Sequence, residues 1–313
     1  MTPPKNLNIK SIMIRQRLEK HKEKLRTEHD NKEQNIGQIK KWIDEAQSMN
    51  DVELEISLLL ALGQYYKSKG DAEKALTAYQ NAEQVYQQSE GSTIDLIRIK
   101  SNIANIMIED FLQYQQGVDQ YQEIVNMAHD MPPEKALLVK LQCYCNISHI
   151  FIRMNQYENA IPPLKHFWEH WEDPLINTVD RTKLGKQVCI ARRAQAMVHI
   201  INGDYTQAHN EIRLLHDISK QLENHSYIIT GYLILITLAL RDPNHTTDPQ
   251  DYWQQADMYV DGLLKTQDNS LHAVAEHSYE AGADQFAYLK HDDWAQCCRE
   301  KARMILAHIQ NET

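Results

Sequence analysis

Two histidines four residues apart form the most chemically suggestive spacing in this 313-residue chain. His166 and His170 lie in the run HFWEHW, and on a helix this spacing places both imidazoles on one face, as a two-histidine metal site requires. A third ligand is not evident, and the neighbouring Trp168 and Trp171 favour an aromatic packing patch. The sequence therefore predicts no metal site and no cofactor. A metal-dependent enzyme built on these histidines is the weakest of three functional hypotheses.

The five cysteines would offer reactive thiols or metal ligands only in a suitable arrangement. Cys143 and Cys145 would project from different faces of one helix, and Cys189 stands alone. Cys297 and Cys298 are adjacent and cannot both face one core. We therefore expect buried packing thiols. An odd number of cysteines without a disulfide framework predicts a reducing, cytoplasmic compartment.

The sequence lacks the short backbone-loop motifs of several common enzyme classes. It contains no GxxxxGK[ST] phosphate loop, no GxGxxG motif and no GxSxG elbow. We therefore expect a protein that is not an enzyme. No apolar run is long enough to cross a bilayer, so membrane insertion is not expected.

Helical hairpins are the elements that must position any functional side chain. Small residues recur twelve positions apart, where two antiparallel helices would approach closely, and one further pair is thirteen apart. The twelve-residue pairs are Gly63 and Ala75, Ser148 and Ala160, and Ala196 and Ala208, and the longer one is Ala104 and Gly117. The chain has few glycines and prolines, and no segment alternates convincingly between apolar and polar residues as a β-strand would. Both features indicate an almost wholly helical chain.

The clearest repeat, from Ile56 to Ser89, resembles the tetratricopeptide repeat (TPR) family. The resemblance implies an all-α, right-handed superhelical solenoid of antiparallel helical hairpins. The second-helix anchors are 41 to 48 residues apart, against about 34 in the consensus repeat. They are Ala75, Gly117, Ala160, Ala208, Ala256 and Cys297. This long period resembles the divergent repeats of bacterial regulatory proteins that bind signalling peptides in a superhelical groove.

Charge separates the two expected parts of the chain. Residues 1–27 carry eight basic and two acidic side chains, whereas the whole chain has a net charge of −10. We expect a basic amphipathic helix over residues 1–30 that caps the array, with docking to an acidic partner, a nucleic acid or a membrane surface as the alternative. The acidic balance of the rest argues against nucleic-acid binding by the array, which leaves only the basic segment for such contact.

The array itself is expected over residues 31–313. A pre-array helix over 36–48 precedes six hairpins at about 53–89, 95–128, 136–171, 181–221, 223–266 and 271–309.

The resemblance also implies the binding residues, because the first helix of each TPR hairpin lines the concave surface. Asn102 and Asn146 stand two positions before small residues, where family members present an Asn amide to a peptide backbone. Arginines near these positions would bind a carboxylate. The ligand-binding candidates are Gln64, Arg98, Asn102, Asn105, Asn146, His149, Arg153 and Arg193. Any one of them alone is also compatible with a merely solvated polar position, whereas the set as a whole favours the groove.

The sequence therefore predicts a non-enzymatic, regulatory binding module that recognises an extended peptide or a partner helix in its concave groove. The alternative is a structural adaptor in a multiprotein assembly, which would use its outer faces and the basic N-terminal helix. A clamp for the C-terminal carboxylate of chaperones is disfavoured, because the positions that would supply its cations hold Leu60, Gln64 and Gln142.

Overall fold

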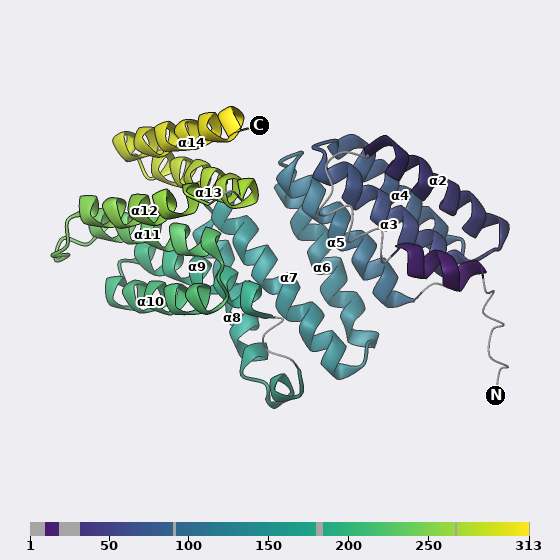
Figure 1. Ribbon diagram of the computed structural model, residues 1–313. Helices are drawn as coiled ribbons and strands as arrows, with labels where there is room; N and C mark the ends of the chain where they lie inside the picture. Colours follow the sequence, from purple (N-terminus) through teal and green to yellow (C-terminus); the bar gives the residue numbers. More distant parts are fainter. Residues whose placement is uncertain (1–9, 19–31, 90–91, 180–183, 267, 313) are drawn as a thin grey trace. The chain divides into compact units, whose positions relative to one another are not determined.

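A computed structural model describes residues 10–18, 32–89, 92–179, 184–266 and 268–312. In these ranges every regular element is a helix (Figure 1). Beyond a helix over residues 10–18, the α-helices are α2 (Lys32–Ser48), α3 (Val52–Ser68), α4 (Ala72–Gln87), α5 (Thr93–Glu109), α6 (Tyr114–Met127), α7 (Pro133–Arg153), α8 (Tyr157–Trp171), α9 (Gly185–Asn202), α10 (Tyr205–Gln221), α11 (His225–Arg241), α12 (Pro249–Leu264), α13 (Asn269–Tyr288) and α14 (Asp292–Glu312). Short 3-10 turns follow α6 at Ala128–Asp130 and α8 at Pro174–Thr178.

The chain divides into two compact units, Met1–Pro132 and Pro133–Thr313. In the first unit α3 pairs with α4 and α5 with α6, and α2 packs on α3. In the second unit the pairs are α7 with α8, α9 with α10, α11 with α12 and α13 with α14. There the first helices of successive hairpins also contact one another, in the order α7, α9, α11 and α13. The second unit therefore has a continuous layer of first helices.

Local side-chain chemistry fixes where the helices begin and turn. The side chains of Asp51, Asp71 and Ser92 accept backbone N–H groups at the starts of α3, α4 and α5, as good N-caps do. Gly203 ends α9 with a φ of +81°, a conformation that favours glycine. A turn at Lys290, which has a φ of +61°, precedes α14, and Asp292 opens that helix.

Close helix contact in the first hairpin depends on a different partner from the expected one. A Cβ added to Gly63 would lie 2.7 Å from Cδ1 of Tyr79, so the tyrosine ring rather than Ala75 fills the space beside the glycine. Tyr79 and Ala75 are nevertheless both fully buried on α4. The expected pair of Ala104 and Gly117 does meet, because a Cβ on the glycine would lie 3.7 Å from the alanine carbonyl oxygen.

The last anchor also differs by one position. Cys297, expected to pack between the final two helices, is exposed. Cys298 is fully buried instead, in a cluster that contains Tyr279 and Phe286. The remaining second-helix anchors all lie in buried positions of their helices.

The described part of the basic N-terminal segment packs on the first unit. Ile14 and Leu18 are each 2% exposed and join the core that contains Trp42. Arg15 donates to a carboxylate oxygen of Asp51 at 3.0 Å, and the Ser11 hydroxyl donates to the other oxygen. Residues 10–18 thus cover one end of this core. The expected boundary at residue 30 falls in residues 19–31, outside the described part of the chain.

The contact between Gly63 and Tyr79 gives a test of the packing. We expect Gly63→Ala to destabilise the protein by about 1–3 kcal/mol, because the added methyl group displaces a buried ring. Gly37→Ala in α2 is the matched control, since a Cβ there meets nothing within 4 Å. That control should stabilise the protein by about 0.5–1 kcal/mol through helix propensity. Denaturant unfolding measures both changes, and equal effects would contradict the assignment.

Candidate functional site

In the first unit, two of the predicted asparagines already make hydrogen bonds within the protein. The Asn102 amide donates to the backbone carbonyl of Arg98 at 2.9 Å. Asn105 accepts the Tyr121 hydroxyl at 2.6 Å and so joins α5 to α6. Arg98 donates to Asp95 at 3.3 Å, while Gln64 is an exposed residue of α3. A ligand at Asn102 or Asn105 would have to share or replace these bonds.

In the second unit, the predicted residues gather on two neighbouring helices. Asn146, His149 and Arg153 lie on α7 at spacings of three and four, which places them along one helix face. Arg193 lies on α9, which packs against α7. Lys186 stands seven residues before Arg193 and therefore faces the same way. We call His149, Arg153, Lys186 and Arg193 the basic cluster.

Positive charge dominates this cluster. The pKa of His149 is held well below its usual value by burial and then by the nearby Arg193, Arg153 and Lys186. The pKa of Arg193 is lowered too, by burial and by Arg153. His149 and Arg193 are half-buried, whereas Arg153 and Lys186 are exposed beside them. The cluster therefore consists of two half-buried side chains, His149 and Arg193, and two exposed cationic side chains, Arg153 and Lys186.

Arg193 differs from its neighbour Arg192 on the same helix. The Arg192 guanidinium donates to Glu211 at 2.7 Å and lies 4.2 Å from the Trp168 ring centroid. The Nε atoms of both arginines are buried without a hydrogen-bond partner among the described residues, but Arg193 makes no hydrogen bond or ion pair to a described carboxylate. An unsatisfied buried donor is costly, so a ligand that accepts from it gains that free energy back.

Tyrosines stand beside the basic cluster. Tyr157 on α8 and Tyr227 on α11 both lie close enough to Arg193 to act on its charge. Burial raises the pKa of Tyr157 to about 12, and burial raises that of Tyr227 as well. The Tyr157 ring also lies 6.1 Å from that of Tyr288. Both tyrosines therefore stay protonated at neutral pH and supply neutral aromatic surface.

Sequence reasoning missed Lys186, Tyr157 and Tyr227 as members of this site. The seven-residue spacing of Lys186 from Arg193 was available as a signal. Nothing in the local sequence around Tyr157 links it to Arg193. No local pattern brings Tyr227 to Arg193, since that approach depends on how α9 and α11 pack.

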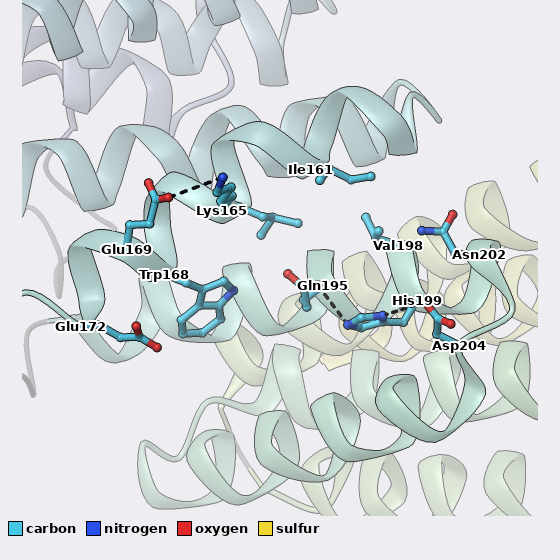
Figure 2. Close-up of a pocket in the computed structure, with 11 residues that line it drawn as sticks. Ile161, Lys165, Trp168, Glu169, Glu172, Gln195, Val198, His199, Asn202 and Asp204 are labelled. Carbon is cyan, nitrogen blue, oxygen red and sulfur yellow. Dashed lines mark hydrogen bonds and ion pairs between the residues drawn. The ribbon is translucent and has the colours of Figure 1, made fainter.

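A hollow of about 500 Å³ lies between α8, α9 and the start of α10 (Figure 2). Trp168, Val198 and Ile161 supply its apolar surface. The side chain of Gln195 contacts Nε2 of His199 at 3.0 Å. The residues of α9 that line this hollow come two to nine positions after Arg193. Because an α-helix turns by about 100° per residue, they lie on the side of α9 opposite to Arg193. We call this hollow the outer pocket.

The outer pocket carries more negative than positive charge. Its lining includes the carboxylates of Glu169, Glu172 and Asp204. Lys165 pairs with Glu169 at 3.8 Å, and Nδ1 of His199 lies 3.6 Å from Asp204 (Figure 2). Its charge is therefore opposite to that of the basic cluster.

The two histidines with metal-site spacing serve in packing. The rings of His166 and His170 lie 5.2 and 5.7 Å from that of Tyr144 on α7. His166 also contacts Glu169 at 3.0 Å. Among the described residues, no group of three or more His, Cys, Asp or Glu side chains is arranged to hold a metal ion.

The cysteines are free, and four of them are buried. Burial raises the pKa of Cys143 and of Cys298 to about 12. Such thiols stay protonated at neutral pH and are poor nucleophiles.

Comparison with known proteins supports the fold. A family model described as 26S proteasome subunit RPN7 matches residues 21–164, which is less than half of the chain. No curated protein sequence matches.

Among solved structures, the apo form of RapI has a TM-score of 0.70 at 14% identity, with 93% of this chain and 97% of that chain covered. Aspartyl phosphate phosphatase F from Bacillus subtilis has a TM-score of 0.62 at 17% identity, with 88% and 68% covered. A Rap protein complexed with Competence and Sporulation Factor has a TM-score of 0.61 at 15% identity, with 94% and 75% covered. These likenesses confirm the all-α, TPR-like solenoid fold.

Within the described ranges, no helix combines the length and the apolar character that a bilayer crossing demands.

The burial of His149 predicts acid sensitivity. Its pKa is lowered in the folded protein, so below its ordinary pKa of about 6.5 the unfolded chain binds a proton that the folded chain does not. Stability should therefore fall as the pH drops below about 6.5, and His149→Gln should make this fall shallower. Urea unfolding at a series of pH values measures the slope. His129→Gln, at an exposed histidine, is the control and should keep the wild-type slope.

Proposed function

We propose that this chain is a non-enzymatic regulatory module that binds an extended peptide or a partner helix along the first helices of its second unit. The observation that carries the proposal is Arg193, which lies beside the half-buried His149 and, unlike Arg15 and Arg192 with their similarly buried Nε atoms, makes no ion pair with a described carboxylate. The N–H donors of Arg193 and His149 contribute little to packing, and a ligand that supplies hydrogen-bond acceptors would pair with them.

Asn146, His149, Arg153 and Arg193 are the proposed contact residues. An Asn amide both donates and accepts, which suits the backbone of an extended peptide. The layer formed by α7, α9 and α11 is long enough to follow such a segment, because each helix adds its own row of side chains. Gln64, Arg98, Asn102 and Asn105 of the first unit stay predictions as ligand contacts.

A solved relative in fold supports this function by analogy. The Rap protein noted above was solved in complex with Competence and Sporulation Factor, so a chain of this architecture holds a ligand. Fold alone does not determine function, and the basic cluster is therefore the main support.

The alternative is a structural adaptor that uses outer faces, and two observations favour it specifically. The matching family model describes a subunit of the 26S proteasome, which is a multiprotein assembly. The outer pocket also presents Trp168 and Ile161 beside carboxylates, a surface suited to an apolar and basic segment of a partner. The described part of the basic N-terminal segment supports this alternative less, since Ile14 and Leu18 are buried.

The non-enzymatic character and the cytoplasmic location belong to the same proposal. High thiol pKa values and five free cysteines are consistent with a reducing compartment. Since one similar structure is named a phosphatase, the purified protein should be assayed on a receiver domain phosphorylated at aspartate. We expect an unchanged rate of dephosphorylation, and acceleration by the wild type would overturn the non-enzymatic proposal.

Paired surface variants separate the two functions. We expect Asn146→Ala with Arg193→Gln to release a ligand that co-purifies with the wild-type protein from its native host. Ile161→Asp with Glu172→Lys in the outer pocket should leave that ligand bound. Quantitative mass spectrometry of co-eluting peptides and proteins measures both, and circular dichroism checks that each variant is folded. The reverse pattern would support the adaptor and contradict the proposal.

A further inference from the structure

We propose that the outer pocket is a docking site for an extended segment of a partner protein that presents one large apolar side chain between two basic ones. This inference goes beyond the proposed function, because it assigns a second contact to the side of α9 opposite to Arg193. Three features of the hollow support it, namely an apolar centre, acidic ends and open access.

The centre of the outer pocket is apolar and reachable from solvent. Leu164 and Val198 line it and are 2% and 4% exposed, whereas Ile161 lines it and is 43% exposed. The volume of about 500 Å³ lies in the range of ligand-binding clefts. A leucine-sized side chain placed against these residues would remove apolar surface from water on both partners, which favours binding.

Carboxylates stand at both ends of this apolar centre. Glu169 lies near the end of α8 beside Trp168, and Asp204 lies just beyond the end of α9 (Figure 2). The Trp168 ring lies 4.2 Å from the Arg192 guanidinium, and α9 runs for ten more residues after Arg192, which is about 15 Å of helix. The two acidic ends are therefore separated by roughly that length.

The charges within the hollow leave its ends acidic. Three carboxylates line it against one lysine. That lysine, Lys165, lies 3.8 Å from Glu169, and both side chains are more than half exposed, so the pair is weak and can be exchanged for a partner's cation. Asp204 is 58% exposed although it lies 3.6 Å from Nδ1 of His199. The carbonyl end of α9 adds partial negative charge at this same end of the hollow.

An extended segment with the pattern Lys-x-Leu-x-Lys matches these features. In an extended chain every second side chain points to the same face, and residues four apart are separated by about 13 Å. The leucine would enter the apolar centre while the two lysines reach the acidic ends, and their flexible stems cover the remaining distance. Acidic residues at the lysine positions would be repelled, so the hollow also discriminates between partners.

Four fluorescein-labelled, amidated peptides test this site on the full-length protein. The first carries Lys-x-Leu-x-Lys among Ser and Gly residues. The second replaces the leucine by Ser, the third replaces both lysines by Gln, and the fourth replaces them by Glu. Fluorescence anisotropy should show at least about tenfold tighter binding of the first peptide than of the second, which is the worth of one buried leucine side chain. Its advantage over the third should be about fivefold and should shrink at high salt.

Variants of the protein assign this binding to the outer pocket. Ile161→Ser and Asp204→Lys should each weaken binding of the first peptide about fivefold, the one by lost apolar contact and the other by repulsion. The Asp204 side chain makes no capping bond to α10, so its replacement leaves that helix start intact. Met258→Ser and Asp284→Lys are the matched controls, since both residues are exposed and neither lines the hollow. These controls should keep the wild-type affinity.

A photoreactive leucine analogue in the first peptide gives a second readout that needs no variant. Cross-links on the wild-type protein should map to Ile161–Glu172 of the α8 region or to Gln195–Asp204, and cross-links elsewhere would overturn the proposal. It is also overturned by equal binding of all four peptides, by preference for the Glu peptide, or by no binding of any peptide. Equal weakening by Asp284→Lys and Asp204→Lys would show attraction to net charge alone and would likewise contradict a built site.

Discussion

The structure depends on the close packing of helices in antiparallel hairpins, since no sheet or metal organises the described chain. A helix pair can approach closely only where one member gives up side-chain volume, as Gly63 does beside Tyr79 and Gly117 does beside Ile108. Because each hairpin packs mainly on its neighbours, the apolar residues of a helix are committed to those contacts. The polar positions between them carry little of the fold and are open to a function.

Because apolar residues determine the packing and polar residues between them form the site, the fold was more predictable from the sequence than the site. The small-residue spacing and the apolar stripes follow from helix geometry, which acts over a few residues and is visible in sequence. The errors in the fold were local. Gly63 packs on Tyr79 rather than Ala75 because a ring one turn away reaches the glycine, and Cys298, one position beyond Cys297, is the buried cysteine of α14.

The site depends on contacts between hairpins, which sequence spacing does not encode. His149, Arg153 and Arg193 could be selected one by one as polar positions on first helices. Their common electrostatic environment, which also includes Lys186, arises only when α7 packs on α9. In the same way, Asn105 has the residue type of a ligand contact, but the partner of its amide is Tyr121 on the next helix. The residue type thus indicates a possible ligand contact, but the packing of neighbouring helices determines whether the side chain is already used in a contact within the protein.

The basic cluster and the outer pocket lie on opposite sides of α9 and carry opposite charge. This arrangement allows one helix to serve two kinds of contact without competition between them, because an anion drawn to Arg193 is repelled from Asp204 and Glu172. Since α9 carries Arg193 on one side and supplies Gln195, Val198 and His199 to the outer pocket on the other, any shift of this helix on ligand binding would alter both surfaces together.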